Sequence, residues 1–414
     1  MRQVTDAFNF YQGNDPRELA ANFGSPLYVY NERIFRKRCG EMLSLSSYPN
    51  FVVNYAIKAN TNLTLLKIAR EEGCHADISS AGEAVAAMAA GFMPEEMLFV
   101  VNNVSEEELS YAVKNNITVS VDSLSQLDRL GKVNPGGRIA LRFNPGIGGG
   151  HHEKVVTGGD GTKFGIMPEY IPQVKELLAK HDLKLIGINH HIGSQNWGDL
   201  YLEGVGALLN LARQFDDLEF IDLGGGFAIP YHKQDGEKPL ELKTVGEILD
   251  KHLFDFAKSY GKEITFMIEP GRYLTAECGV LLGTVNSVKT NGSTHYAGTD
   301  LGFSVLKRPT IYDSHHDVEI YRDGEIDFLN TQTINIVGNQ CESGDYIARA
   351  RELPALREDD ILGVLDAGAY GYSMACQYNH RPRPAEILIQ ADNTPKLIRR
   401  RETFEDILTT MRGL

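Results

Sequence analysis

The sequence predicts an α/β protein in which a (β/α)8 TIM barrel is joined to a second, mostly β domain of the β-sandwich or barrel-like kind. The chain has 414 residues, which is long for a single domain. Between about residue 50 and residue 270, short apolar runs alternate with longer helix-like stretches, as in parallel strands joined by helices. After about residue 280 strand-like runs continue without crossover helices. We therefore expect a barrel at residues 37–280 and a β domain made of residues 1–36 plus 281–414.

Eight apolar or β-branched runs predict the strands of the barrel. They are Phe51–Ile57, His75–Ile78, Met97–Val101, Ile117–Val121, Arg138–Phe143, Lys184–His190, Leu218–Leu223 and Ile264–Ile268. Two helix starts are predicted between these strands, at Ser80 with Glu83 and at Ser105 with Glu108. In each, the serine can cap backbone amides of the first turn, and the glutamate three residues later can reach back to the start of the helix.

The C-terminal part contains further strand-like runs separated by turns. They are Gly283–Val288, Val318–Tyr321, Thr333–Val337, Asp360–Leu365, Glu386–Gln390 and Lys396–Ile398. The run Leu27–Tyr30 precedes the barrel, so we expect it to join the same β domain.

Composition and charge exclude several classes of protein. The formal net charge of −14 repels nucleic-acid phosphates and anionic lipids. Apolar stretches fall short of the roughly 20 residues that cross a bilayer, and the opening residues MRQVTDAFNF lack a signal pattern. The five cysteines show no CxxC spacing and are odd in number. We expect a cytoplasmic protein that binds no nucleic acid or membrane and has no disulfide scaffold or metal site.

Polar residues or glycines stand at the end of each predicted barrel strand or directly after it and would meet at one rim, where barrels of this kind place their chemistry. Any one of them could be an ordinary loop residue, but eight together weaken that interpretation. They are Lys58, Asp77, Asn102, Asp122, Arg142, His191, Gly224–Gly226 and Glu269–Arg272.

Lys58 closes the first strand, so its amine should emerge from a desolvated strand end. Burial would disfavour its charged form, as an imine with an aldehyde cofactor or a carbonyl substrate requires. A lysine that only extends its amine out of the barrel is an equally good interpretation of this segment alone.

The glycines after the last two strands predict a phosphate site, since backbone without side chains lets amides approach phosphate oxygens. Gly224–Gly226 alone could be a tight turn, but Gly271–Arg272 follows the adjacent strand. Glu269 could keep a pyridine nitrogen protonated and His191 could stack on its ring. Taken singly, Glu269 could be an ion-pair partner of Arg272, and His191 could be a core histidine.

The β domain contains a second polar group. Cys341 stands among acidic residues that would keep its thiol protonated, which suits a proton donor, although it could also be an inert buried thiol. Arg308 and Tyr312 could hold a substrate carboxylate. Tyr370 lies in an aromatic turn that could close over a ligand or pack in a sheet.

Six segments together resemble the alanine racemase-like, fold-type III PLP enzymes, and within them most resemble the diaminopimelate decarboxylase family. They are Tyr55–Asn60, His191–Gln195, Gly224–Gly226, Glu269–Arg272, Cys341–Asp345 and Gly368–Tyr370. Their order and spacing agree along nearly the whole chain, and Arg401–Phe404 is similar to the Arg-Glu-Thr-Tyr with which the family closes.

The resemblance implies a homodimer that decarboxylates meso-2,6-diaminopimelate to L-lysine and CO2, with pyridoxal 5'-phosphate (PLP) as cofactor. It implies that Lys58 binds PLP covalently, Cys341 protonates the substrate carbon and the Cys341 loop comes from the second subunit. The expected cofactor-binding residues are Lys58, Asp77, His191, Ser194, Gly225, Gly226, Glu269, Gly271, Arg272 and Tyr370. The expected substrate-binding residues are Arg272, Arg308, Tyr312, Glu342 and Tyr370.

Three segments depart from the family pattern. Asp300–Ser304 replaces Asp-Ala-Gly-Met-Asn, Phe227–Ile229 replaces Leu-Gly-Ile, and Gly338–Gln340 replaces the usual Gly-Pro before the cysteine. They leave the PLP chemistry intact, but Phe303, Ser304 and Phe227 bear on the exact substrate.

Other activities compete with this interpretation. A related decarboxylase could act on carboxynorspermidine, D-ornithine, D-lysine or a carrier-linked amino acid, although Arg308 and Glu342 suit a substrate end with both a carboxylate and an ammonium. A racemase would present an arginine to the pyridine nitrogen where Glu269 stands. A non-catalytic relative would not need both Lys58 and Cys341.

Overall fold

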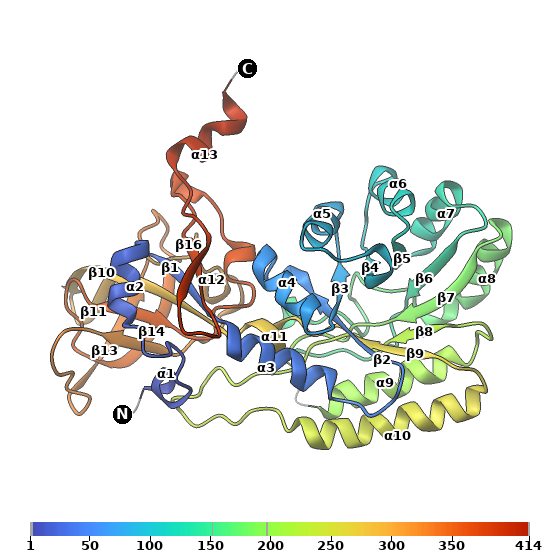
Figure 1. Cartoon of the computed structure of the whole chain (residues 1–414), viewed down its shortest axis with the longest axis horizontal. Coiled ribbons are helices and arrows are strands. Elements are labelled where there is room, and N and C mark those ends of the chain that lie inside the picture. Colours follow the sequence, from blue (N-terminus) through green and yellow to red (C-terminus); the bar gives the residue numbers. More distant parts are fainter. Residues whose placement is uncertain (1–2, 151, 196–197, 413–414) are drawn as a thin grey trace. The chain divides into compact units, whose positions relative to one another are not determined.

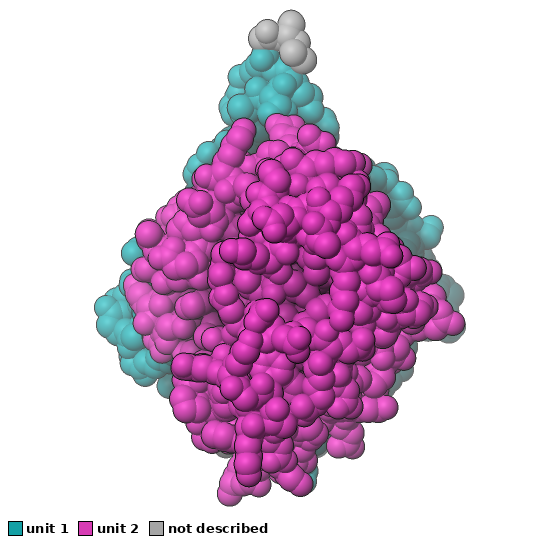
Figure 2. All heavy atoms as spheres, turned by 90° about the vertical axis from the view of Figure 1, so that its right-hand side faces the viewer, with its two compact units in different colours: residues 1–37, 230–238, 275–414 teal, residues 38–229, 239–274 magenta. Residues whose placement is uncertain are grey.

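The computed structural model describes residues 3–150, 152–195 and 198–412 and divides the chain into two compact units (Figure 1). The barrel unit comprises residues 38–229 and 239–274. The β unit comprises residues 1–37, 230–238 and 275–414. Figure 2 gives each unit its own colour. Residues 230–238 therefore lie in the middle of the barrel sequence but belong to the β unit.

Eight parallel strands of the described chain close into a barrel in sequence order, each paired with the next and the last with the first. This confirms the predicted barrel. The strands are β2 (Phe51–Ala56), β3 (His75–Ile78), β4 (Met97–Val100), β5 (Thr118–Val121), β6 (Arg138–Arg142), β7 (Lys184–Asn189), β8 (Phe220–Asp222) and β9 (Thr265–Ile268). Leu98 and Val100 of β4, Ala140 of β6, Ile186 of β7 and Phe220 of β8 form one buried apolar cluster.

Helices follow the barrel strands and surround them in Figure 1. They are α4 (Leu63–Glu71), α5 (Ala81–Ala89), α6 (Glu106–Lys114), α7 (Leu124–Val133), α8 (Ile171–Lys180), α9 (Asp199–Ala212) and α10 (Leu242–Tyr260), with α3 (Glu32–Leu43) before β2 and α11 (Arg272–Thr275) after β9. Short 3-10 turns are η1 (Ile57–Ala59), η2 (Pro94–Glu96), η3 (Glu153–Val155), η4 (Pro168–Tyr170), η5 (Tyr372–Met374), η6 (Tyr378–His380) and η7 (Thr409–Met411).

The two predicted helix starts are confirmed, with one difference in bonding. At α6 the hydroxyl of Ser105 accepts from the Glu108 amide, and the Glu108 carboxylate accepts from the Ser105 amide. At α5 the hydroxyl of Ser80 accepts from the Glu83 amide, but the Glu83 carboxylate accepts from Ser79. The Glu83 carboxylate therefore bonds to the amide of Ser79, one residue before the capping serine.

The β unit contains a nine-stranded mixed sheet among the described residues, with the main order β14-β13-β11-β10-β1-β16-β17 and with β15 joining β10 to β12. Its strands are β1 (Leu27–Asn31), β10 (Gly279–Asn291), β11 (Thr294–Thr299), β12 (Val318–Tyr321), β13 (Thr331–Val337), β14 (Tyr346–Pro354), β15 (Ile361–Val364), β16 (Ala385–Ile389) and β17 (Pro395–Arg399). Its helices are α1 (Val4–Ala7), α2 (Pro16–Phe23), α12 (Arg308–Tyr312) and α13 (Phe404–Leu408).

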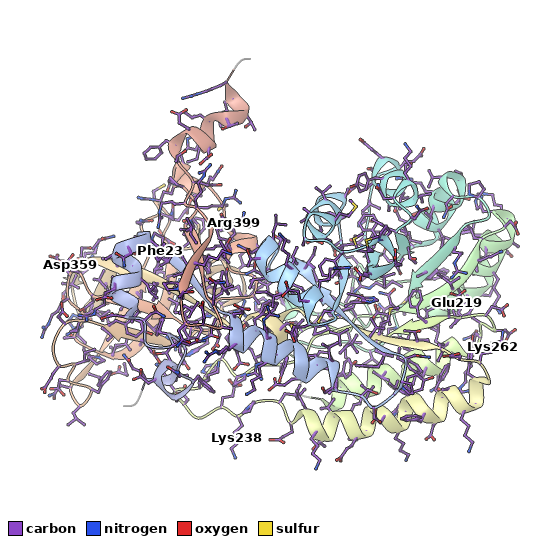
Figure 3. The ribbon with its side chains drawn as sticks, viewed as in Figure 1. Phe23, Glu219, Lys238, Lys262, Asp359 and Arg399 are labelled. Atoms are coloured by element: carbon purple, nitrogen blue, oxygen red, sulfur yellow. The ribbon has the colours of Figure 1, made fainter. Side chains whose placement is uncertain are left out.

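Strand β1 lies between β10 and β16, which confirms that the run before the barrel joins the β domain. The sequence did not predict β11 and β14. A buried carboxylate ties the neighbouring strands together, because Glu386 of β16 accepts from the Tyr30 hydroxyl at 2.7 Å and pairs with Arg399 of β17, labelled in Figure 3. Among the described residues, no helix is both long and apolar enough to cross a membrane.

Candidate active site

Lys58 and Asp77 come together at the ends of two neighbouring barrel strands. Lys58 lies in the turn η1 directly after β2, and Asp77 lies on β3, whose register pairs Asp77 with Ala56. The Lys58 Nζ donates to Asp77 Oδ2 at 2.8 Å. The Asp77 side chain is buried, and its Oδ1 has no hydrogen-bond partner in the described chain. The buried carboxylate therefore fixes the direction of the Lys58 amine.

The expectation of a desolvated Lys58 amine is wrong for this chain. The Lys58 side chain is 42% exposed and forms an ion pair with the buried Asp77 carboxylate. The short turn explains the difference, because it carries Lys58 past the buried end of β2 between the buried residues Ile57 and Ala59.

Glu269 directly follows β9 and is buried in the barrel unit beside a second carboxyl group. Asp222 of β8 is the neighbouring carboxyl, and burial raises the pKa of both groups. The pKa of Asp222 rises to about 6. The pKa of Glu269 lies well above its usual value, first because of burial and then because of the charges of Asp222 and Asp77. The Glu269 Oε1 has no hydrogen-bond partner among the described residues, so this group needs a buried donor.

His191 and the glycine triplet form the neighbouring part of the rim. The Gly225 amide donates to His191 Nδ1 at 3.1 Å, so the imidazole accepts at that nitrogen. Burial lowers the pKa of His191 well below its usual value, and Arg142 and Lys58 add to this effect. A Cβ atom at Gly225 would lie 2.0 Å from the carbonyl oxygen of Glu269. The close packing of these two strand ends therefore requires glycine at position 225.

Ser194 and Arg272 are also brought together. The Arg272 Nη2 donates to the Ser194 hydroxyl at 2.8 Å, and its Nε donates at 3.2 Å. Gly271 precedes Arg272, and a Cβ there would meet Ala56 and Ala59 near β2. Gly226 has a positive φ of 102° in the preceding loop. Hydroxyl, guanidinium and bare backbone thus gather on the loops after β7, β8 and β9, which is the donor set that binds phosphate.

The Cys341 loop forms a separate group in the β unit. Cys341 is exposed, and its backbone amide and Sγ contact the Asn379 side chain, each at 3.2 Å. The neighbouring Glu342 accepts from the Tyr378 hydroxyl at 2.6 Å. This hydrogen bond raises the pKa of Tyr378 to about 12. The structure thus holds the predicted thiol and carboxylate side by side at the surface of their unit.

The other predicted β-unit residues lie on α12 and on a turn after β15. Arg308 begins α12 with 1% of its surface exposed, and Tyr312 ends the helix half-buried. Tyr370 has a positive φ of 56° in the turn that follows β15. These positions belong to the β unit and do not test the expected contacts with cofactor or substrate.

The three departures from the family pattern have local explanations. Ser304 and Gln340 contact each other, because the Gln340 Nε2 donates to the Ser304 hydroxyl at 2.7 Å. The amides of Phe303 and Gln340 donate to the two oxygens of Asp345, at 2.7 and 2.8 Å. In the barrel unit, Phe227 is buried and its ring lies 4.8 Å from that of Tyr201. Two of the departures therefore help to fix the Cys341 loop, and the third packs in the core.

Asp222 is the site residue that the sequence reasoning missed. It lies inside the predicted run Leu218–Leu223, which was interpreted only as a strand. A carboxylate near the end of this largely apolar run was the available signal, because an unpaired charge is seldom buried without a function. Arg142 was noted at the rim but was not assigned to the site, and it is buried with an unpartnered Nη2 among these carboxylates.

His190 makes stability depend on pH. Burial lowers its pKa from 6.5 to about 4, and its Nε2 donates to the Leu223 carbonyl oxygen at 3.0 Å. Above pH 6.5 its contribution to stability is complete, and it is lost as the pH falls through the folded-state pKa, because the unfolded chain takes up a proton first. His190→Gln keeps a hydrogen-bond donor but does not titrate. Between pH 6.5 and pH 4 the free energy of unfolding of this variant should therefore change less than that of the wild type, and the difference should be about 3 kcal/mol at most. Chemical denaturation of the purified protein as a function of pH measures this.

His252→Gln, on helix α10, is the matched control, because it removes a histidine from outside the barrel interior. A wild-type slope in His190→Gln would contradict the prediction.

The barrel rim fits a phosphorylated pyridine aldehyde. Lys58 supplies an amine, the loops around Ser194 and Arg272 supply phosphate donors, and a pyridinium N–H would give the buried Glu269 Oε1 the donor that it lacks. A cationic ring would also offset the repulsion among the carboxyls of Glu269, Asp222 and Asp77.

Comparisons with known proteins agree with this arrangement. Residues 35–276 match the family model "Pyridoxal-dependent decarboxylase, pyridoxal binding domain". The diaminopimelate decarboxylases of Methanothermobacter thermautotrophicus and Escherichia coli K12 are 39% and 36% identical to this chain, and the alignments cover 96% and 94% of it and 94% of each relative. The crystal structure of diaminopimelate decarboxylase from M. jannaschii in complex with L-lysine is 31% identical, covers 96% of this chain and 94% of its own, and has a TM-score of 0.86. The chain therefore belongs to the diaminopimelate decarboxylase family of PLP-dependent decarboxylases.

Proposed function

We propose that the enzyme converts meso-2,6-diaminopimelate to L-lysine and CO2, the last step of lysine synthesis. The observation that carries this proposal is the near full-length similarity to two diaminopimelate decarboxylases, at 39% and 36% identity. A related structure that contains L-lysine supports the same product. Bound PLP supplies an electron sink for the pair of electrons released when the bond between the α-carbon and the carboxylate breaks.

The barrel residues hold the cofactor and set its charge. Lys58 provides the amine that binds the aldehyde, and Asp77 orients that amine. Glu269 accepts a hydrogen bond from the protonated pyridine nitrogen, and His191 covers the ring face with a neutral imidazole. The residues assigned to the phosphate are Ser194, Gly225, Gly226, Gly271, Arg272 and Tyr370.

The substrate residues recognise the end of the molecule that does not react. Arg272, Arg308 and Tyr312 bind its carboxylate, and Glu342 binds its ammonium, with Tyr370 beside them. Cys341 donates a proton to the α-carbon after CO2 leaves. A site built to pair both charged groups rejects analogues that lack either one, because its own polar groups would stay unpaired.

We also propose a homodimer in which the Cys341 loop of one subunit completes the site of the other, so that the β unit contributes to catalysis as well as to the fold. The exposure of Cys341 within its own chain supports this arrangement. We place the enzyme in the cytoplasm, and the five free cysteines support a reducing compartment.

A side-by-side measurement of CO2 release tests the substrate. The substrates are meso-diaminopimelate, D-ornithine, D-lysine and carboxynorspermidine, assayed with the PLP-loaded enzyme. We expect kcat/KM for meso-diaminopimelate to exceed the others by about a hundredfold or more, since each of them lacks a partner for a charged residue of the site. Preference for any other substrate would reject the proposal.

A further inference from the structure

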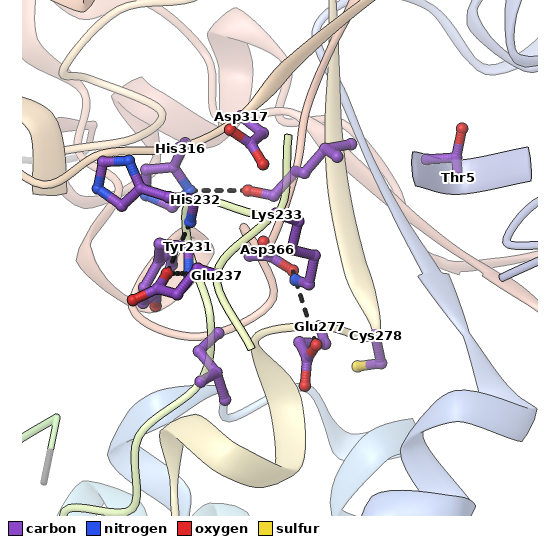
Figure 4. Close-up of polar contacts among 12 residues, drawn as sticks. Thr5, Tyr231, His232, Lys233, Glu237, Glu277, Cys278, His316, Asp317 and Asp366 are labelled. Carbon is purple, nitrogen blue, oxygen red and sulfur yellow. Dashed lines mark hydrogen bonds and ion pairs between the residues drawn. The ribbon is translucent and has the colours of Figure 1, made fainter. Parts of the chain in front are cut away.

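The proposed substrate residue Arg308 lies in a buried polar cluster of the β unit. The cluster also contains His316, which precedes β12, and Tyr231. Tyr231 lies in the segment 230–238, which interrupts the barrel sequence and belongs to the β unit. Arg308 is 1% exposed and His316 is fully buried. Figure 4 shows His316 beside Tyr231 and His232. A buried guanidinium needs partners that fix its orientation, and this cluster supplies them.

Two hydrogen bonds define the protonation state of His316. Its Nδ1 lies 2.7 Å from the carbonyl oxygen of Leu365, and its Nε2 lies 2.7 Å from Arg308 Nη1. A carbonyl oxygen only accepts, so Nδ1 carries the hydrogen. A guanidinium only donates, so Nε2 must accept. The hydrogen-bond network therefore assigns His316 as the neutral Nδ1–H tautomer.

Tyr231 fixes the guanidinium from a second direction. The Arg308 guanidinium carbon lies 4.5 Å from the centre of the Tyr231 ring, which meets the His316 ring edge to face at 5.3 Å. The segment of Tyr231 is itself anchored, because the buried Lys233 pairs with Glu277 at 3.1 Å and with Asp366 at 2.5 Å, as Figure 4 shows. The cluster is thus a rigid support for one guanidinium.

We infer that His316 is a positioning residue, whose neutral Nε2 holds Arg308 in the orientation that binds the carboxylate at the non-reacting end of the substrate. This inference rests on the proposed function. A carboxylate in place of His316 would neutralise the guanidinium, whereas a neutral imidazole orients it without adding negative charge.

Two substitutions separate positioning from a merely structural role. His316→Gln places an amide oxygen near the former Nε2 and keeps an acceptor for Arg308, but it loses the donor to Leu365. His316→Asn keeps a donor near the former Nδ1 for Leu365 but has no acceptor that reaches Arg308. We expect His316→Asn to raise KM for meso-diaminopimelate about tenfold to a hundredfold while kcat changes much less, and His316→Gln to stay near the wild type.

Product binding provides a readout other than turnover. L-lysine keeps the carboxylate of the non-reacting end, whereas 1,5-diaminopentane lacks it. Inhibition constants measured with the PLP-loaded enzyme should rise for L-lysine in His316→Asn and in the control Arg308→Gln, but not for 1,5-diaminopentane in either variant.

The outcomes distinguish this inference from the proposed function. Two outcomes would show that His316 is not a positioning residue. In the first, Arg308→Gln weakens inhibition by L-lysine but His316→Asn does not. In the second, His316→Gln raises KM for meso-diaminopimelate as much as His316→Asn does. If Arg308→Gln leaves L-lysine inhibition unchanged, the assignment of Arg308 to the substrate is wrong, and the role of His316 is rejected with it.

Discussion

Lys58→Ala is expected to abolish decarboxylation and the covalent attachment of PLP together. The variant removes the proposed amine that binds the aldehyde and leaves Asp77 without its cation. We expect kcat to fall by a factor of about a thousand or more. CO2 release measures turnover, and the visible absorbance of the lysine-bound cofactor, with mass spectrometry after borohydride reduction, measures attachment.

Lys58→Arg is the matched control for this experiment. It keeps a cation that can pair with Asp77 but no primary amine. If covalent attachment is the essential property, both variants are inactive, and Lys58→Arg is the better folded of the two. Retention of turnover and of reducible PLP attachment in either variant would refute the role of Lys58.

The inactive Lys58→Ala protein also tests the shared site. When it is mixed with Cys341→Ala under conditions that exchange subunits, each mixed dimer should contain one site with both Lys58 and Cys341. About a quarter of the wild-type activity should then return, because about half of the dimers are mixed and each has one intact site. If no activity returns although subunit exchange is shown, Cys341 does not act across the dimer.

Glu269→Gln is expected to lower kcat by about a hundredfold to a thousandfold while PLP attachment persists. The amide has nearly the same shape but no negative charge, so it cannot keep a pyridine nitrogen protonated. The expected loss is that of one charge-stabilising interaction in a buried site. CO2 release by the PLP-loaded variant measures it, and near wild-type turnover would contradict the assigned role.

The same substitution should stabilise the protein without its cofactor. Burial and the charges of Asp222 and Asp77 raise the pKa of Glu269, so the stability contributed by its protonated form is lost as the pH rises through the folded-state value. Gln does not ionise, and the apoenzyme variant should be more stable at neutral pH by about 1 kcal/mol or more. Chemical denaturation should show this gain shrinking as the pH falls. An apoenzyme variant less stable than the wild type would show that Glu269 is structural.

The barrel and its rim were predictable because local sequence patterns determine them: apolar runs alternate regularly with helix-like stretches, and the rim residues stand where the runs end. A run such as Met97–Val101 is buried on both faces, so it is apolar throughout, and the residue after each strand must lie at the rim. The β strands that were missed have weaker signals. β11 contains glycine and polar residues, and β14 contains two arginines and a glutamate, so neither resembles a buried strand.

Contacts between distant residues were less predictable. The hydrogen bond between Ser304 and Gln340 and the cluster of Arg308, His316 and Tyr231 join segments far apart in sequence, and no periodicity encodes such pairs. The exposure of Lys58 depends on a three-residue turn that the strand pattern does not reveal. Fold and rim therefore follow from local patterns, whereas the orientation of site residues follows from tertiary packing.

The central place of β1 in the β unit has a consequence for synthesis on the ribosome. Val29 pairs with Val280 on one side and with Ile387 on the other, so both neighbours of this fully buried strand are translated long after it. Until they emerge, the apolar segment LYVYN remains an unpaired edge that can associate with other nascent chains. Truncated products that end before β16 should therefore aggregate and be degraded, even when their barrel residues are complete.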